Sequence, residues 1–397
     1  MRNAREKNWM LPTGVDDVLG PQAYLMENLR NRILREMFSW GYQFTIPPML
    51  EYLDSLLDGV GPDLKLQTFA VTDQSSGRLL GIPADITPQI ARIDRLNKAQ
   101  DELRRYCYAG SVMHSVSNVM GGSRNPLQIG AELYGHDGVE SDIEIILLLV
   151  KTLKVAGIAD LTLELSDMGI FRELCKIGEL DKDLENDVLK LLLTKNRDDL
   201  KKLLDFSSVG EQNQSFILSL LDLNGGEETI ETAKATLSSV SSSIANALDK
   251  LNLVVKHLQN RCKNLNIHID FAELQGYRYH SSITFSVYIP HFGRAIAWGG
   301  RYNSLYDGKG TFATGFSTDL KTLVELSSAS ESESSCGVSI YAPAGNEPEL
   351  INLIEKLRTE GNIVVQGFSD TGSKELGQYS EIVVKSKGKW TRTQLKN

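Results

Sequence analysis

An amide and a carboxylate stand on one predicted strand of this 397-residue chain, and both could bind a small ligand. Gln128 and Glu132 lie four residues apart in the segment Leu127–Tyr134. Because side chains alternate across a strand, this even spacing places both on the same face of a sheet. Together they suit a small cationic or amino-bearing ligand. The alternative is an amphipathic strand with a solvated polar face.

The strand that carries this pair is one arm of a predicted hairpin, Arg105–Gly135. Tyr106–Val112 forms the incoming arm, and the middle of the segment is rich in glycine and serine, with Gly121, Gly122 and Ser123 in sequence. Such a stretch between two alternating segments indicates a long loop. The hairpin would therefore bring the loop close to the polar pair.

Composition and charge favour a globular protein that binds neither nucleic acid nor membrane. The chain is 41% hydrophobic and 23% charged, with a formal net charge of -9. Proteins that bind the phosphate backbone of a nucleic acid are more often basic, because contacts with phosphate need Lys and Arg. No run approaches the ~18 apolar residues of a membrane span, and the first residues lack the apolar segment of a signal peptide. We expect a cytoplasmic protein.

The cysteines and histidines show no pattern typical of a metal site. The six histidines have no HExxH spacing, and the four cysteines form no CxxC pair. Widely separated cysteines indicate reduced thiols in the cytosol. They are Cys107, Cys175, Cys262 and Cys336. We therefore expect no bound metal, and the chain has neither a Walker loop nor a GxGxxG sequence that would indicate a bound cofactor.

Hydrophobic periodicity predicts an α+β protein with an antiparallel sheet core that a helical insertion interrupts. The predicted organisation is a core over residues 1–325, an all-helical insertion over about 169–261, a Ser/Glu linker at 326–335 and a small α/β domain over 336–397. The last of these alternates strands and helices, including a helix at Lys374–Gln378.

Local signals place several elements of the core. A helix is expected over Pro21–Trp40, a hairpin over Phe69–Ile82, and an apolar helix that Ser141 caps. The glycines of Gly299–Tyr302 indicate a turn.

The order of the motifs resembles the catalytic core of histidyl-tRNA synthetases over about residues 8–325. The motifs are LPTGVDDVLGPQA, GYQFTIPPMLEY, ADITPQIARID, RYCYAGS…LQIGAELYG, LQGYRYHSSITF, WGGRYNSL and ATGFSTDLKTL. ADITPQIARID is particularly similar to a paralogous family without synthetase activity, the regulatory subunits of ATP phosphoribosyltransferase. The resemblance implies a class II synthetase-like fold that dimerises through the first helix and a Tyr42–Glu51 strand.

The arginines with which a synthetase of this family holds ATP are replaced here. The resemblance places His114 and Val116 in the Arg-His-Glu triplet, Gln275 at the catalytic arginine, and Thr322 at the arginine of the third motif. A guanidinium binds phosphate through two parallel hydrogen bonds, which none of these side chains can make. The nearby Asp319 would repel a triphosphate. The resemblance therefore implies no adenylation and no catalytic residue.

The positions that hold the amino acid are kept. The resemblance implies a histidine pocket formed by Asp85, Thr87, Gln128, Glu132, Tyr279 and Tyr302. The family of regulatory subunits typically has an arginine where this chain has Pro83, so an anion contact there is not carried over. The alternative for all six residues is maintenance of an inherited fold.

Taken together, these features predict a non-catalytic regulatory subunit. The resemblance implies that it binds and activates the short-form catalytic subunit of ATP phosphoribosyltransferase in a hetero-octamer, with histidine as feedback effector. Magnesium and substrates would bind only the catalytic partner. The alternatives are a divergent adenylating enzyme and a tRNA-sensing module, and the acidic charge and short C-terminal segment disfavour the second.

Overall fold

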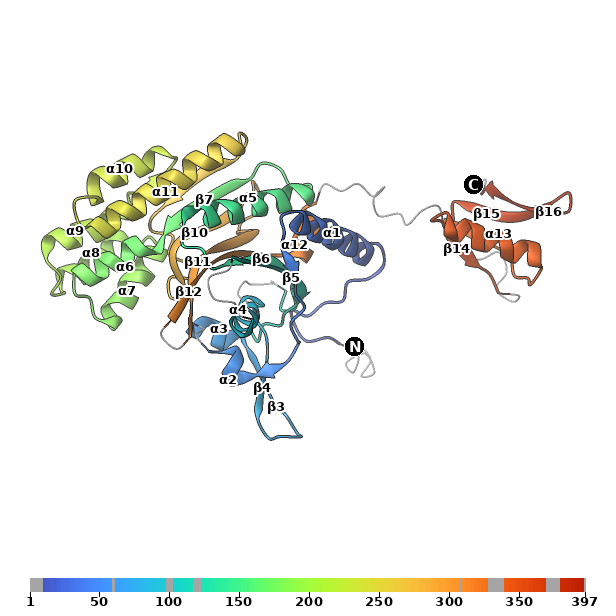
Figure 1. The fold of residues 1–397 in the computed structure, drawn as a ribbon, viewed down its shortest axis with the longest axis horizontal. Helices are drawn as coiled ribbons and strands as arrows, with labels where there is room; N and C mark the ends of the chain where they lie inside the picture. Colours follow the sequence, from blue (N-terminus) through green and yellow to red (C-terminus); the bar gives the residue numbers. More distant parts are fainter. Residues whose placement is uncertain are drawn as a thin grey trace, which may run out of the picture. The chain divides into compact units, whose positions relative to one another are not determined.

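The computed structural model describes residues 10–58, 61–97, 103–116, 123–306, 309–327, 339–368 and 379–395. The chain divides into two compact units at residue 328 (Figure 1). Unit 1 contains Met1–Val18 and Met26–Ser328, and unit 2 contains Ala329–Asn397 with Leu19–Leu25 grouped with it. Most of the predicted Ser/Glu linker and the predicted helix Lys374–Gln378 lie outside the described residues.

Unit 1 is built on a nine-stranded sheet with the order β1-β5-β6-β12-β11-β10-β7-β9-β8. All neighbours are antiparallel except β1 with β5 and β7 with β9. The strands are β1 Gln43–Phe44, β5 Arg104–Ser111, β6 Leu127–Tyr134, β7 Thr162–Asp167, β8 Asn224–Gly225, β9 Asn266–Asp270, β10 His280–Tyr288, β11 Ala297–Tyr306 and β12 Lys309–Asp319. The predicted α+β fold with an antiparallel core is confirmed.

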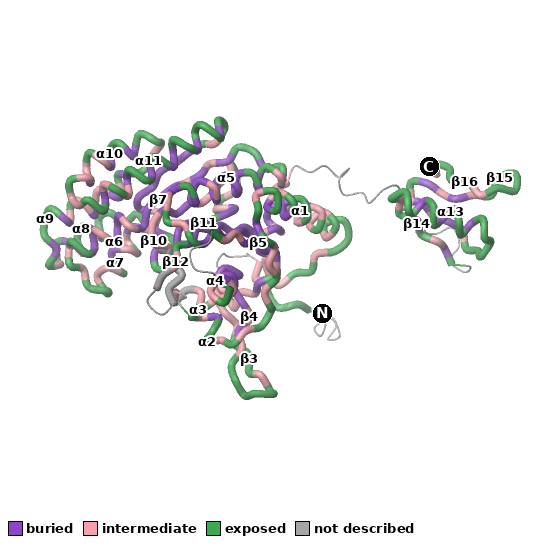
Figure 2. The backbone as a smooth tube through the Cα atoms, viewed as in Figure 1, coloured by how far each residue is buried: buried purple, intermediate pink, exposed green. Residues whose placement is uncertain are grey.

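The two faces of this sheet pack against different helices. Along β6 the odd-numbered Ile129, Ala131 and Leu133 join the main apolar cluster with α1 Gly20–Ser39 and α5 Val139–Val155. The even-numbered Tyr134 instead joins a second cluster with Ile90 of α4 Thr87–Leu96. Figure 2 shows buried backbone running through the sheet and α5. Gln128 and Glu132 therefore lie on the α4 face, as the alternation predicted.

A smaller three-stranded sheet borders α4. Its order is β2-β4-β3, with β2 Glu51–Tyr52, β3 Phe69–Thr72 and β4 Leu79–Ile82. The short helices α2 Leu53–Leu56 and α3 Pro62–Gln67 precede β3, and α12 Leu320–Leu326 follows β12. The predicted Phe69–Ile82 hairpin is confirmed. The expected Tyr42–Glu51 strand is wrong as a continuous strand, because only Gln43–Phe44 and Glu51 within it are strand residues.

The stretch predicted as an insertion contains a series of helices, and four of them begin with a polar side chain that caps the first turn. Asp181 accepts a hydrogen bond from the Leu184 amide (2.8 Å), and Ser241 from the Ile244 amide (3.2 Å). The helices are α6 Met168–Ile177, α7 Lys182–Leu193, α8 Arg197–Asp205, α9 Glu211–Ser219, α10 Glu228–Leu237 and α11 Ser242–Arg261. The expectation of an all-helical stretch is wrong at one place, because β8 pairs with β9 at the sheet edge.

Two further local predictions are wrong. Helix α5 begins at Val139 with Gly138 as its N-cap, and Ser141 lies inside the first turn, where its hydroxyl donates to the Gly138 carbonyl (2.8 Å). Gly299–Tyr302 is not a turn but part of β11. A Cβ at Gly299 would lie 2.2 Å from the Gly315 carbonyl oxygen, so this glycine permits close strand packing rather than a change of direction.

The described residues of unit 2 after residue 338 form a small α/β domain, in which a helix packs on a sheet of order β14-β13-β15-β16. The elements are β13 Ser339–Ala342, α13 Pro348–Thr359, β14 Ile363–Gln366, β15 Glu381–Ser386 and β16 Lys389–Gln394. The first three strands of the order are parallel, as predicted, and β16 adds an antiparallel edge that the sequence did not reveal. In the described part of both units, none of the helices is long and apolar enough to cross a membrane.

Candidate functional site

A hydrogen-bonded bridge links β6 to the loop before α4. The Gln128 side-chain oxygen accepts from the Ile86 amide (2.8 Å), and its side-chain nitrogen donates to Oδ1 of Asp85 (2.8 Å). The same Asp85 oxygen accepts from the Thr87 amide (2.9 Å). These contacts fix both the loop and the orientation of the Gln128 amide.

Glu132 lies at the centre of this face and is only 1% exposed. The hydroxyls of Thr87 (3.0 Å) and Tyr108 (3.2 Å) donate to its Oε1, and the Tyr302 hydroxyl donates to its Oε2 (2.9 Å). Burial raises the pKa of Glu132 to about 8, the charge of Asp85 adds to this, and the hydroxyl donors oppose it. At neutral pH the side chain is therefore mostly protonated.

Stacked tyrosines complete the network. The ring of Tyr302 stacks on that of Tyr279 with centroids 4.8 Å apart, and its hydroxyl lies 2.7 Å from the Tyr134 hydroxyl. The Glu132 carboxylate lies over Gly315, where an added Cβ would be 1.7 Å from Oε2. A side chain at Gly315 would therefore displace the carboxylate.

The structure brings all six predicted histidine-binding residues into one continuous network. Contacts run from Gln128 to Asp85, to Thr87, to Glu132, to Tyr302 and finally to Tyr279. Sequence reasoning missed Tyr108, Tyr134 and Gly315. The strand alternation that selected Gln128 and Glu132 also places Tyr134 on their face, so that signal could have found it.

An open pocket of about 890 Å³ lies beside this network, within the size range of small-molecule sites. Of the six predicted histidine-binding residues, only Asp85 and Gln128 line it, and the other four pack behind them. Three of the replaced ATP positions also line it, namely His114, Gln275 and Thr322. Val116 is 57% exposed and is not among the lining residues.

The pocket wall is acidic. Among the described residues that line it, the carboxylates of Asp85, Glu164, Glu273 and Asp319 face a single guanidinium, that of Arg294. Carboxylates repel phosphate, and a triphosphate needs several cationic donors. The wall is therefore poorly suited to ATP.

The polar side chains at the end of the pocket that contains His114 and Asp319 already form hydrogen bonds within the protein. Asp319 caps α12 by accepting from the Lys321 amide (3.1 Å), and it also accepts from the Thr322 hydroxyl (3.0 Å). Nε2 of His114 bonds to the Ala84 carbonyl (3.0 Å). Arg124, the arginine of the hairpin loop, donates to the carbonyls of His114 (2.9 Å) and Ser115 (2.7 Å). These bonds join Arg124 to the end of the incoming arm of the hairpin.

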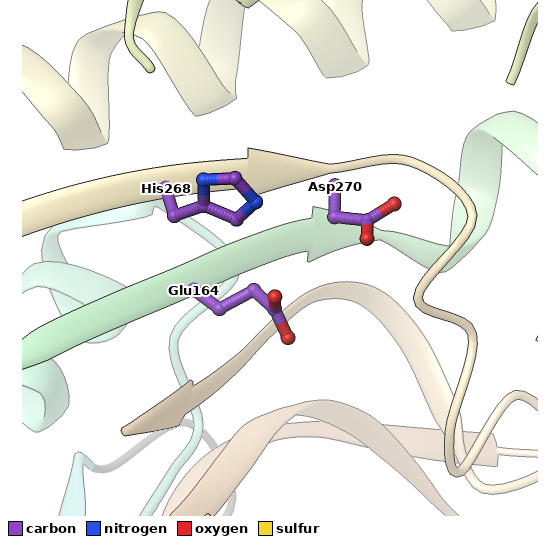
Figure 3. Close-up of side chains that lie close together, drawn as sticks. All are labelled: Glu164, His268 and Asp270. Carbon is purple, nitrogen blue, oxygen red and sulfur yellow. The ribbon is translucent and has the colours of Figure 1, made fainter. Parts of the chain in front are cut away.

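Three possible metal ligands lie together on β7 and β9, toward the β8 edge of the nine-stranded sheet. Glu164 of β7 pairs in register with His268 of β9, and Asp270 follows on the same face (Figure 3). Their ligand atoms all lie within 4.8 Å of one another. A carboxylate and imidazole set suits a divalent transition metal. Asp270, however, already accepts from Lys195 Nζ (2.6 Å) and from the side-chain amide of Asn224 (2.8 Å), so a cation already offsets its charge.

Comparison with known proteins supports the class that this fold indicates. Residues 14–323 match the family model for histidyl-tRNA synthetase, and residues 337–393 match that for the ATP phosphoribosyltransferase subunit HisZ C-terminal domain. A crystal structure of an ATP phosphoribosyltransferase regulatory subunit/histidyl-tRNA synthetase from Bacillus halodurans C superposes with a TM-score of 0.81 at 23% identity, covering 93% of this chain and 95% of that chain. Fold and site thus define a class II, histidyl-tRNA synthetase-like protein.

Sequence similarity identifies the family within that class. The ATP phosphoribosyltransferase regulatory subunit of Nitrosococcus oceani is 43% identical over 386 residues, which is 96% of each chain. The chain belongs to the family of ATP phosphoribosyltransferase regulatory subunits. A solved ATP phosphoribosyl transferase (HisG:HisZ) complex from Thermotoga maritima also has this fold, with a TM-score of 0.57 at 18% identity over 74% of this chain and 96% of that chain.

Proposed function

We propose that this chain is a non-catalytic regulatory subunit that binds and activates the catalytic subunit of ATP phosphoribosyltransferase, in the first step of histidine biosynthesis. Family membership supports the regulatory role, and the name of the Thermotoga maritima complex supports a catalytic partner. One structural observation carries the non-catalytic part. The network from Gln128 to Tyr279 is intact, while the neighbouring wall presents four carboxylates and one guanidinium where ATP would need cations. Magnesium and the substrates would then bind the catalytic partner, and the complex would act in the cytoplasm.

We further propose that histidine binds at the network as feedback effector. Asp85 and Gln128 reach the pocket, so they can receive the ammonium group of an amino acid. Glu132 and Tyr279 lie behind them, among polar groups that can hydrogen-bond an imidazole. An effector shifts an equilibrium only if it binds two states with different affinities. Histidine would therefore have to bind the inhibited and active assemblies unequally.

Exposed apolar residues near the start of unit 1 support a self-dimer within a larger hetero-oligomer. Phe38 of α1 and Ile46, Met49 and Leu50 after β1 are all exposed. Several large apolar side chains on one short stretch are typical of a protein interface. The dimer surface would then include α1 and the segment that follows it.

Reconstitution with a short-form catalytic subunit tests the proposed function. We expect the two chains to co-purify, the rate of phosphoribosyl transfer to rise when this chain is added, and histidine to reduce that rate. Separate chains on size exclusion and an unchanged rate would overturn the regulatory role. If histidine gives no heat with either the isolated chain or the complex, the assignment of the pocket is wrong.

A divergent adenylating enzyme is the second candidate, because the six residues that the resemblance assigns to the amino acid form one network. Histidine-dependent exchange of pyrophosphate into ATP by the purified chain distinguishes the two. We expect no exchange, since His114, Gln275 and Thr322 cannot neutralise the transferring phosphate. Exchange above background would contradict the non-catalytic assignment.

A further inference from the structure

The pocket contains a notch that the proposed function does not use. Glu164, Ser286 and Trp298 pair in register across β7, β10 and β11, and all three line the pocket. Paired residues on neighbouring strands point to the same face, and strands lie about 4.8 Å apart. The backbones of Trp298 and Glu164 therefore lie roughly 10 Å apart, and only the small Ser286 lies between them. We name these three residues the outer notch.

A second carboxylate lies close to that of Glu164 in the outer notch. Glu273 lines the pocket together with Glu164. Asp270 adds a third negative charge nearby, and Lys195 and the Tyr288 hydroxyl offset part of the negative charge on Glu164. The nearby Lys195 forms its ion pair with Asp270 instead. A cation beside Glu164 would relieve this repulsion.

A buried hydroxyl next to the outer notch has no partner. Ser166 lies two residues after Glu164 on the same face of β7 and also lines the pocket. It is 2% exposed, and its Oγ has no hydrogen-bond partner in the protein. Buried polar groups are rarely left unsatisfied. A hydroxyl oxygen readily accepts from an N–H donor, so this atom suits a nitrogen-bearing ligand.

The half-exposed indole of Trp298 indicates which kind of cation fits. Its side chain is 48% exposed at the pocket wall. Tryptophan provides the most favourable aromatic face for an ammonium or guanidinium group. An indole supplies no ligand atom to a metal ion, so this wall favours an organic cation.

We propose that the outer notch binds a small organic cation whose guanidinium or ammonium group lies between Trp298 and Glu164. A second N–H donor on the ligand would reach Ser166, which lies roughly 7 Å along the strand from Glu164. The outer notch shares its pocket with Asp85 and Gln128, but none of its three residues belongs to the histidine network. The regulatory subunit would then sense a cationic metabolite in addition to its proposed effector.

Calorimetric titration of agmatine into the full-length chain tests this site, because agmatine carries a guanidinium and an ammonium on one short chain. At pH 8 we expect saturable binding. Glu164→Gln and Trp298→Phe should each weaken it by roughly tenfold or more. Glu211→Gln removes a carboxylate from the exposed start of α9 and should leave binding unchanged.

Several outcomes would overturn the proposal. These are the absence of binding to the unmodified chain, equal affinity in the Glu164, Trp298 and Glu211 variants, and displacement of agmatine by AMP but not by putrescine. Circular dichroism of each variant identifies any loss of folding. If Trp298→Phe does not fold, Trp298→Leu replaces it as the variant without an indole. Activation of the catalytic subunit is measured in parallel with Glu164→Gln. We expect activation to be retained, so failure of the outer notch and failure of the regulatory role are separable.

Discussion

The Tyr302 hydroxyl joins two buried groups, because it donates to Oε2 of Glu132 at 2.9 Å and lies 2.7 Å from the Tyr134 hydroxyl. Tyr302→Phe removes the oxygen and leaves both groups without this partner. Leaving buried polar groups unpaired costs about 1–3 kcal/mol. We expect a loss of that size in the free energy of unfolding, measured with urea. Tyr52→Phe, on an exposed ring, should change it by less than about 0.5 kcal/mol, and equal losses would contradict the role of Tyr302.

The raised pKa of Glu132 predicts a stability that falls as pH rises. The folded chain holds a proton to about pH 8, whereas the unfolded carboxyl releases it near its ordinary pKa of 4.5. The contribution is therefore fully present below about pH 4.5 and is lost as pH rises to about 8, by at most roughly 5 kcal/mol. Glu132→Gln keeps the shape and cannot titrate. The unfolding free energy of the unmodified chain should fall more steeply between pH 5.5 and 8.5 than that of the variant, and parallel curves would exclude this cause.

The same carboxyl group predicts that histidine binding releases a proton. At pH 7 the free Glu132 is mostly protonated, and a nearby ligand cation favours its ionised form, which lowers its pKa. Titrations in phosphate and Tris, whose ionisation enthalpies differ, should therefore give different observed heats. For Glu132→Gln the heats should agree after correction for the ligand. Identical heats in both buffers for the unmodified chain would show that the ligand leaves Glu132 neutral.

Local patterns in the sequence predicted the elements better than their long-range roles. The alternation along β6 correctly placed Gln128 and Glu132 on one face. The glycines before Tyr302 were interpreted as a turn, because glycine at a turn and glycine under a neighbouring side chain look alike in a sequence. Only the assembled sheet shows that Gly299 lies against the carbonyl of Gly315.

The candidate site, too, could be predicted from the sequence only in part. Resemblance to a family selected the six residues of the network, but the Tyr302–Glu132 bond joins residues 170 positions apart. The register of β6, β12 and β11 brings them together. No local pattern specifies that register, and none predicts that Glu164 and Glu273 line one pocket.

Gly315 has a steric role that substitution can test. A Cβ there would lie 1.7 Å from Oε2 of Glu132 and 2.9 Å from the Ala131 carbonyl oxygen. Gly315→Ala should therefore displace the carboxylate and lower the free energy of unfolding by about 1–3 kcal/mol, as overpacking does. At Gly293 an added Cβ meets nothing within 4 Å, so Gly293→Ala is the matched control. Thermal unfolding of both variants measures the difference, and equal melting temperatures would be inconsistent with the close approach of Glu132.

Arg301, next to Tyr302 on β11, anchors this strand to α5 through a buried ion pair. It is 4% exposed, and its Nη2 lies 2.8 Å from Oδ2 of Asp142, while its contact with the exposed Asp137 is longer, at 3.4 Å. Arg301→Ala would leave the Asp142 charge buried and uncompensated, which costs about 3–5 kcal/mol. Asp137→Asn should cost less than about 1 kcal/mol, because exposed pairs contribute little.

Urea unfolding of both variants gives the comparison. If they lost equal stability, the Asp142 contact could not be the anchor. Because Arg301 directly precedes Tyr302, the alanine variant should also weaken histidine binding, whereas Asp137→Asn should not.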